Sequence, residues 1–526
     1  MARKERVKWE FGDFQTPAEL AREAISVLVR RGLRPETVIE PSCGEGAFFL
    51  VALEAFPEAA CYVGSDINEQ YLETLRSKVC VHPLSQRCRV QHADFFHFNW
   101  KEFAASAPSP VLVLGNPPWV TSAELGMLGS SNLPAKSNFQ RRRGLDAVTG
   151  KSNFDISEWM LLECMSWLEN GVGAIAVLCK SSVARKLLQQ AWKSRLPVSD
   201  AQIYSIDANK HFSAAVDACF LVIEIGAGPV SQDCAIFDSL SSPQPSRVIG
   251  YHDDTVVSDV ECYKRWSHLR GDDSAYTWRS GVKHDCSKIM ELEKHGAQFQ
   301  NQLGELIDLE EEYVFPMLKS SDLATSGQVR YGRKYMLVTQ SLVGEDTAPI
   351  QVNAPRTWDY LQKHRALLDG RGSSIYKKRP SFSVFGVGDY AFAPWKVAIS
   401  GFYKSLHFNI VEPVLTRPVV LDDTGYFLPC WSREEANFVA QILASKPAQE
   451  FLRSMIFWDE KRPITVELLK RLDLKALSVE LGMEQVYTAF ARRRRDRQTE
   501  AVRGQLSLGI AEKRGRYASS PRTASN

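Results

Sequence analysis

The chain has 526 residues, enough for two or more domains that each bury their own core. Its 44% hydrophobic and 24% charged residues are typical of a globular protein, and a formal net charge of +2 indicates no particular kind of partner. The sequence contains no run of about 18 apolar residues, and its charged start lacks the apolar segment of a signal peptide. These features exclude a predicted membrane span and predict a cytoplasmic protein.

Helices and strands are predicted to alternate from residue 17 to about residue 225. Apolar positions at helical spacing predict helices, and short apolar runs predict buried strands. The predicted helices cover 17–32, 46–56, 67–79, 155–171 and 181–195. The predicted strands cover 37–41, 61–66, 88–96, 110–118, 171–179, 201–207 and 215–226. This alternation predicts an α/β domain over residues 1–230, with a mostly parallel, doubly wound sheet.

The pattern changes after residue 230. Residues 231–485 mix short strands, aromatic residues and turns, with helices predicted only near 432–445 and 463–472, so we expect a mixed α+β domain. Residues 486–526 are expected to form a basic, disordered tail. Ten Lys and Arg residues against three acidic residues in 485–526 fit a nucleic-acid-binding arm and a solvated tail equally well.

The eleven cysteines predict free, largely buried thiols. Their number is odd, no two are spaced as CxxC, and several, such as Cys179 and Cys219, lie in apolar runs. We therefore expect neither disulfides nor a metal site.

The residues that follow each strand are candidates for a ligand site, because open parallel sheets bind ligands at the carboxyl ends of their strands. Gly44 and Gly46 form a small turn after the first strand, where the backbone can approach a ligand, although both phosphate-binding glycine fingerprints are missing. Asp66 ends the second strand and suits a ribose diol, with a helix N-cap as the alternative. Asp94 ends the third strand beside Phe95, where the pair suits an adenine ring, and a loop acid beside a core ring is the alternative.

Seven segments, in a fixed order, resemble the successive motifs of the γ class of DNA adenine-N6 methyltransferases, in particular the TaqI-like modification enzymes of type II restriction systems. The segments are FQTPAELA, VIEPSCGEGAFF, VGSDIN, HADFF, GNPPW, GKSNFDISEWM and HFSAAVDACFLVIEI. The resemblance covers about residues 10–225 and implies a Rossmann-like methyltransferase fold. Its Asn-Pro-Pro-aromatic motif is specific for methylation of a planar amino nitrogen, and protein-glutamine methyltransferases share it.

The chemistry of this motif follows from Asn116-Pro117-Pro118-Trp119. An exocyclic amino group is a poor nucleophile because its lone pair is delocalised into the ring. The side-chain oxygen of Asn116 and the carbonyl of Pro117 can each accept one of its hydrogens, and the two prolines hold that carbonyl rigidly. Trp119 offers a flat face to an adenine turned out of the helix. A strand-ending turn with a core tryptophan is the alternative, and it does not account for the asparagine.

The resemblance implies S-adenosylmethionine as the cofactor and no metal. The residues implied for its binding are Thr16, Glu40, Pro41, Gly44, Gly46, Asp66, Asp94 and Phe95. Thr16 also suits an N-cap in a capping box with Glu19. Phe212 is expected to stack on the second face of the flipped base, with a place in the core as the alternative. Trp119 stands where tyrosine or phenylalanine is commoner in the family, so the size of the base pocket is expected to differ.

Residues 231–485 are expected to be the target-recognition domain, because a duplex methyltransferase must read base edges. A segment at 121–149 carries an arginine run that could clamp DNA phosphates or edge a solvated lid. Lys151 and Asn153 match the next family segment. The candidate DNA-binding residues are Arg141, Arg142, Arg143, Lys151, Arg330, Arg333, Lys334, Lys377, Lys378 and Arg379.

The sequence thus predicts a site-specific adenine-N6 DNA methyltransferase that acts on double-stranded DNA. No nuclease signature is recognisable, so the expected partner is a separate restriction endonuclease. We expect a monomer in the bacterial cytoplasm, associated with the nucleoid through its DNA. The alternatives are methylation of a protein glutamine or an RNA adenine, a DNA-binding subunit without catalysis, and a fused restriction-modification enzyme.

Overall fold

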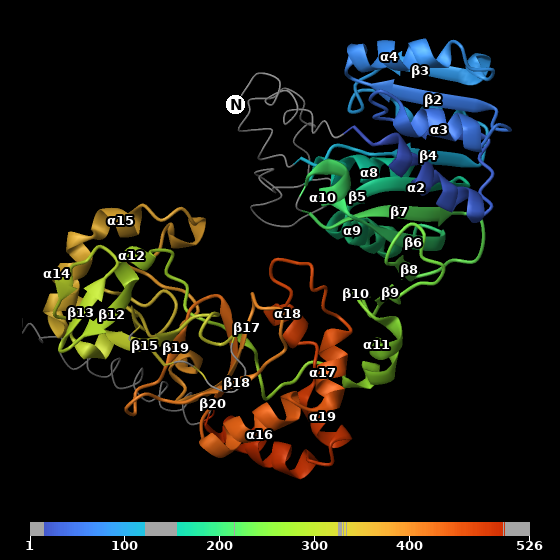
Figure 1. Cartoon of the computed structure of the whole chain (residues 1–526). Coiled ribbons are helices and arrows are strands. Elements are labelled where there is room, and N and C mark those ends of the chain that lie inside the picture. Colours follow the sequence, from blue (N-terminus) through green and yellow to red (C-terminus); the bar gives the residue numbers. More distant parts are fainter. Residues whose placement is uncertain are drawn as a thin grey trace, which may run out of the picture. The chain divides into compact units, whose positions relative to one another are not determined.

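The computed structural model describes residues 15–120, 155–214, 216–324, 329, 331–332, 334–497 and 499. The chain divides into two compact units, Met1–Glu261 and Cys262–Asn526 (Figure 1). In the described part of the chain, no helix is long and apolar enough to cross a membrane.

The first unit is built on a ten-stranded sheet (Figure 1). Its order is β10-β9-β8-β6-β7-β5-β4-β1-β2-β3. The bounds are β1 Thr37–Glu40, β2 Cys61–Asp66, β3 Cys88–His92, β4 Val111–Gly115, β5 Gly173–Lys180, β6 Val198–Ile206, β7 Ala218–Ile225, β8 Asp233–Phe237, β9 Arg247–His252 and β10 Thr255–Val257. Strands β3, β2, β1, β4 and β5 are parallel, whereas β7 runs antiparallel to both β5 and β6. The chain leaves β1 towards β2 and returns on its other side with β4, which places the topological switch point at β1 and β4.

Helices cover both faces of this sheet. They are α2 Ala18–Arg30, α3 Ala47–Ala55, α4 Glu69–Val79, α5 Trp100–Ser106, α8 Ile156–Trp167, α9 Ser181–Lys193 and α10 Ala208–Phe212. Side chains of α2, α3 and α4 share one core with alternate residues of the central strands, such as Leu112 and Leu114. Helix α8 packs against α5 and α9, outside that core. The central strands β1 and β4 are buried throughout, as expected for parallel strands with helices on both sides.

The expected domain boundary at residue 230 differs from the division in the structure, which falls after Glu261. The reason is that β8 pairs with β6, and β9 and β10 extend the same sheet. Short strands separated by turns are the pattern that the sequence analysis assigned to the second domain. The hydrogen bonds of β8 to β6 assign these strands to the first unit.

The second unit contains two smaller sheets. One has the order β11-β20-β17-β18, with bounds β11 Arg279–Ser280, β17 Trp395–Ser400, β18 Asn409–Val411 and β20 Gly425–Cys430. The other has the order β14-β13-β12-β16-β15-β19, with bounds β12 Glu291–His295, β13 Gln298–Asn301, β14 Leu306–Ile307, β15 Val314–Leu318, β16 Lys334–Leu337 and β19 Val420–Leu421. The mixed α+β character expected for this part of the chain is present.

The second unit has more helices than the two that the sequence predicted. They include α11 Val260–Trp266, which spans the division between the units, α12 Ser287–Met290, α13 Ile350–Asn353, α14 Pro355–Lys363, α15 Arg365–Asp369, α16 Arg433–Leu443, α17 Lys446–Arg453, α18 Val466–Leu469 and α19 Leu474–Glu480. Helix α14 begins with Pro355, which favours a first helical turn, and buries Tyr360 and Leu361 against the six-stranded sheet.

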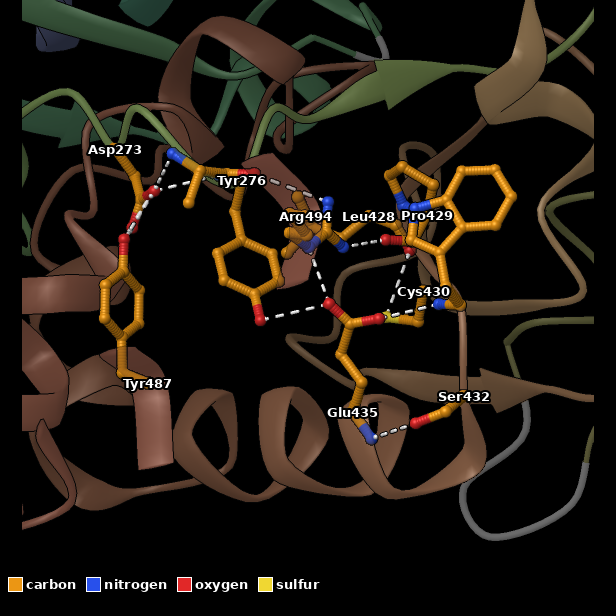
Figure 2. A network of polar contacts seen from close by, with 11 residues as sticks. Asp273, Tyr276, Leu428, Pro429, Cys430, Ser432, Glu435, Tyr487 and Arg494 are labelled. Atoms are coloured by element: carbon orange, nitrogen blue, oxygen red, sulfur yellow. Dashed lines mark hydrogen bonds and ion pairs between the residues drawn. The ribbon is translucent and has the colours of Figure 1, made fainter. Parts of the chain in front are cut away.

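The expected tail begins as a helix. Residues 484–497 are helical, and Arg494 is buried against α16 (Figure 2). Its Nε donates to Oε1 of Glu435 at 2.6 Å, and its guanidinium lies 4.0 Å from the ring centre of Tyr276. The prediction of a disordered tail is therefore wrong at Arg494. Four consecutive arginines give no sign in the sequence that one of them faces the interior of the protein.

All eleven cysteines are free thiols, as the sequence predicted. Six of them are buried: Cys43, Cys164, Cys179, Cys219, Cys234 and Cys430. Among the residues that the structure describes, no group of three or more His, Cys, Asp or Glu side chains could hold a metal ion.

Candidate functional site

A cavity that is partly open to solvent, with about 130 Å³ of solvent-accessible space, lies at the carboxyl ends of β1 to β4. It lies at the switch point of the sheet, where this fold class binds its ligands. The residues that line it include Gln15, Thr16, Pro41, Gly44, Asp66, Asn68, Tyr71, Asp94, Phe95, Asn116, Pro118, Ile156 and Met160.

The carboxylate of Asp66 organises the turn after β1. Its Oδ2 accepts from the backbone N–H of Gly44 at 2.8 Å, and its Oδ1 accepts from the N–H of Asn68 at 2.9 Å. The N-cap of α4 is Asn68, whose side chain accepts from Gln70 N, so the alternative in which Asp66 caps that helix is wrong. Asp66 lines the cavity and shapes the glycine turn opposite it.

Asp94 and Phe95 lie on the same wall of the cavity. Oδ1 of Asp94 accepts from Phe96 N at 2.9 Å, and its Oδ2 lies 2.7 Å from Nδ1 of the exposed His97. Phe95 is nearly buried, and its ring packs among aromatic rings that include Trp100 and Trp159. The wall therefore combines a carboxylate with the edge of an aromatic cluster.

Glu40 and Gly46, which the resemblance placed around the cofactor, do not line the cavity. Glu40 is fully buried beneath it, and that burial, together with the nearby Asp66 carboxylate, raises the pKa of Glu40 well above its usual range, against a backbone hydrogen bond from Phe49. Gly46 is the N-cap of α3 with φ 83°, and a Cβ there would lie 2.3 Å from Leu75 Cδ1. Both residues therefore lie on the side of the Gly44–Gly46 turn that faces away from the cavity.

Gly115 allows Glu40 to pack directly behind the end of β4. Its φ is 140°, and a Cβ on it would lie 3.2 Å from Cγ of Glu40. A side chain at this position would be strained and crowded. The next residue, Asn116, begins the turn that reaches the cavity.

Asn116 is oriented by Thr16. The Nδ2 of Asn116 donates to Oγ1 of Thr16 at 3.3 Å, and both residues line the cavity. Helix α2 has Pro17 as its N-cap and no side-chain cap, so the capping box predicted for Thr16 and Glu19 is wrong. Because Nδ2 is directed at Thr16, the acceptor oxygen Oδ1 of the same amide is directed elsewhere.

Trp119 and Phe212 lie in contact. Both rings are buried, and their centres are 5.1 Å apart with the planes at 68°, an edge-to-face pair. Both also belong to the hydrophobic core of the unit, which is the alternative expected for Phe212, and its stacking on a flipped base stays a prediction. A base held between the two rings would require them to separate.

Sequence reasoning missed Asp155, Lys180 and Met160. Met160 lines the cavity from α8. Lys180 ends β5, and its Nζ lies 2.6 Å from Oδ2 of Asp155 and 3.2 Å from the carbonyl oxygen of Trp119. The rule applied to the other strands, reading the residue at each carboxyl end, would have found Lys180.

The candidate DNA-binding residues are only partly described. Arg141, Arg142, Arg143, Lys151, Arg330 and Arg333, and also Asn153, lie outside the described residues. Lys334 is in β16 and lies 3.5 Å from Asp322, whereas Lys377, Lys378 and Arg379 are exposed in the segment after residue 376. The structure thus leaves the run at 377–379 accessible to a partner.

Comparisons with known proteins agree with this fold, which is that of a methyltransferase. A family model described as N-6 DNA methylase matches residues 3–203. The type II methyltransferase M.NspV of Nostoc sp. (strain ATCC 29411 / PCC 7524) is 42% identical over 474 residues, 90% of this chain and 98% of that protein. The DNA complex of the type IIL restriction-modification enzyme MmeI has the same fold, with a TM-score of 0.50 and 13% identity. That match covers 86% of this chain but 64% of MmeI, so the chain spans less than two thirds of that enzyme.

The chain belongs to the family of type II DNA methyltransferases of restriction-modification systems. Its methyl donor is S-adenosylmethionine, and the residues that line the cavity suit this cofactor. The two carboxylates Asp66 and Asp94 suit hydroxyl and amino groups, and the apolar walls of Phe95, Ile156 and Met160 suit a purine ring.

We expect Asp66→Ala to weaken S-adenosylmethionine binding by about ten- to hundredfold. The substitution removes a charged acceptor from the cavity and releases the Gly44 N–H that this acceptor holds. Asp66→Asn is the matched variant, because it retains one acceptor oxygen, and it should show a smaller loss. Titration calorimetry measures both affinities, and wild-type affinity in the alanine variant would contradict the assignment.

Proposed function

We propose that this protein transfers a methyl group to the N6 amino group of adenine within a short sequence of double-stranded DNA. The observation that carries the proposal is the position of Asn116 and Pro118 on the wall of the cavity that fits S-adenosylmethionine. A sulfonium methyl group in that cavity would lie next to the Asn116–Trp119 turn, whose acceptors can bind an amino group. When bound, the cofactor would supply an electrophilic methyl group, and the transfer would form the N6–C bond as the C–S bond breaks to a neutral thioether, with one proton of the amino group released to solvent.

The residues of the Asn116–Trp119 turn prepare the amino group for transfer. Oδ1 of Asn116 and the carbonyl of Pro117 each accept one of its two hydrogens, which localises the nitrogen lone pair. Both acceptors are preorganised, the first by the bond from Asn116 to Thr16 and the second by two proline rings. The adenine must leave the duplex to reach them, and stacking on Trp119, at about 1–3 kcal/mol per base, offsets much of the cost of flipping.

The second unit is proposed to select the DNA sequence. Its exposed basic run at 377–379 suits contacts with phosphates, which set the register of a reader on the duplex. We propose a monomer that works in the bacterial cytoplasm, on nucleoid DNA, beside a separate restriction endonuclease of the same specificity.

Thr16→Val should lower the rate of methyl transfer by about tenfold or more. Valine has the shape of threonine but cannot accept from Nδ2 of Asn116, so the amide loses the contact that orients it. Thr16→Ser retains a hydroxyl and should remain close to the wild type. Single-turnover transfer to DNA at saturating cofactor gives both rates, and equal rates for the valine and serine variants would contradict this role.

The test of the proposed function is sequencing of genomic DNA from a methylation-deficient host that expresses this chain alone. N6-methyladenine at one short sequence is the expected result, and an Asn116→Ala strain serves as the control for background. An unmodified genome, with the protein folded and able to bind S-adenosylmethionine, would overturn the proposal. Methylcytosine in place of methyladenine would overturn the assignment of the base.

A further inference from the structure

A partly buried ion pair holds the far end of the Asn116–Trp119 turn. Nζ of Lys180 lies 2.6 Å from Oδ2 of Asp155 and 3.2 Å from the carbonyl oxygen of Trp119. The side chain of Asp155 is 9% exposed and that of Lys180 is 21% exposed. Neither residue lines the cavity, so the pair acts on the turn and not on a ligand within it.

Asp155 is itself fixed by α8. Its Oδ1 accepts from the backbone N–H of Ser157 at 3.1 Å and from its hydroxyl at 2.5 Å, which caps the helix. The next residue, Ile156, donates its N–H to the carbonyl of Val120 at 2.9 Å. The end of the turn is therefore joined to the start of α8 twice, once through the backbone and once through Lys180.

The turn needs such an anchor at its downstream end. Upstream, Gly115 is fixed because β4 pairs in register with β5, as Gly115 with Val177. The two prolines restrict only their own φ angles, and Trp119 lies beyond the end of β4 at Gly115. A charge-assisted hydrogen bond to the Trp119 carbonyl supplies the second fixed point.

We propose that Lys180 is a positioning residue for methyl transfer, which sets the direction of the Asn116–Trp119 turn through the Trp119 carbonyl while Asp155 holds its ammonium group in place. This inference rests on the proposed function, because it assigns the amino-group acceptors to Asn116 and the Pro117 carbonyl. Lys180 does not touch the substrate or the cofactor, and it acts on the rate by fixing the acceptors. A shift of about 1 Å in such groups can cost about a hundredfold in rate.

The chain offers a matched control for this lysine. Lys186, one turn and a half further along α9, pairs with Glu158 of α8 at 2.7 Å, and the side chain of Glu158 is also buried. Lys186→Met therefore removes a second lysine–carboxylate pair that involves α8. It leaves the Trp119 carbonyl and Asp155 untouched, so it reports what the loss of such a pair does to the unit in general.

The experiment compares Lys180→Met, Lys180→Arg and Lys186→Met with the wild type. We expect Lys180→Met to lower the single-turnover rate about a hundredfold at saturating DNA and cofactor, with unchanged affinity for S-adenosylmethionine. Lys180→Arg should restore part of the rate, because a guanidinium can donate to the same two acceptors. Lys186→Met should remain at the wild-type rate.

Results of three kinds would overturn the proposal. The first is a wild-type rate in Lys180→Met. The second is weaker DNA binding with a normal rate at saturation, which would make Lys180 a phosphate contact. The third is an equal loss of rate in Lys186→Met, or a loss of cofactor affinity in Lys180→Met, because either would mark a merely structural role.

A second measurement separates this proposal from the proposed function. Hydrogen exchange at the Ile156 amide, which donates to Val120, should become faster in Lys180→Met and not in Lys186→Met. This result does not depend on the substrate. If the wild type methylates no adenine, the proposed function fails, but the exchange rate of the Ile156 amide still tests whether Lys180 fixes the turn. If the wild type methylates DNA and the exchange rate is unchanged in Lys180→Met, the role of Lys180 alone is overturned.

Discussion

Asn116→Ala is expected to fold, to bind S-adenosylmethionine and to lose methyl transfer by at least about 10²–10³-fold. That factor is the usual cost of removing one preorganised polar group that acts on the reacting centre. The substitution deletes the only side-chain acceptor in the Asn-Pro-Pro-Trp turn and leaves the Pro117 carbonyl alone to bind the amino group. Single-turnover transfer to DNA, with cofactor affinity measured separately, gives the two quantities that the prediction distinguishes.

Asn116→Asp is the informative companion to this variant. The aspartate side chain has the same length and retains an acceptor oxygen. It lacks the Nδ2 donor that bonds to Thr16, and it adds a negative charge. We expect a rate between those of the wild type and the alanine variant. Near-normal transfer by Asn116→Ala would contradict the role of the turn in binding the amino group. If the variant lost cofactor affinity by the same factor as it lost rate, Asn116 would be a residue that binds the cofactor.

The strands that carry the site were predictable because their patterns are local. Each central strand is a short apolar run buried on both faces, and β2 occupies 61–66 as the sequence predicted. Asp66, Asp94 and Asn116 were found because each lies at or just after the carboxyl end of a predicted strand, although β3 before Asp94 is a half-exposed edge strand. These three residues meet because the carboxyl ends of parallel strands lie at the same edge of the sheet. The alternation of helices and strands in the sequence already implies parallel pairing.

The parts that could not be predicted depend on contacts between distant residues. The bond from Asn116 to Thr16 joins residues a hundred positions apart, and nothing in the local pattern distinguishes it from the predicted helix cap. The burial of Glu40 behind Gly115 likewise requires the pairing of β1 with β4. The strands β8, β9 and β10 were placed in the wrong domain because a short strand carries no signal of which sheet it joins.

The arginine run at 492–495 shows the same limit in the second unit. Its four residues are alike in sequence, but Arg494 is buried whereas Arg492, Arg493 and Arg495 are exposed. The helical spacing of the run determines which arginine faces inward. The position of α16 places the Glu435 carboxylate opposite that arginine, and the sequence does not show this position. One residue of the run is thus structural, and its neighbours remain available to solvent or to a polyanion.

Arg494→Met is expected to destabilise the second unit by about 3–5 kcal/mol. The side chains of Glu435 and Arg494 are only 4% and 9% exposed, and the guanidinium also donates to the carbonyl of Pro429 (Figure 2). Without the guanidinium, the buried Glu435 carboxylate still accepts hydrogen bonds from the Trp431 N–H and the Tyr276 hydroxyl, but it has lost the positive charge of Arg494. The loss of one member of a buried pair usually costs this much, because the remaining charge is uncompensated.

Two further variants test this explanation. Arg494→Met combined with Glu435→Gln removes both charges and retains an acceptor for Trp431 N, so it should recover most of the lost stability. Arg492→Met removes an exposed arginine of the same run and should change the stability by less than about 0.5 kcal/mol. Hydrogen exchange of α16 peptides in increasing urea measures the unfolding free energy of this unit apart from the first. If the double variant is no more stable than Arg494→Met, the stability comes from the packing of the arginine side chain on Tyr276 and not from its charge.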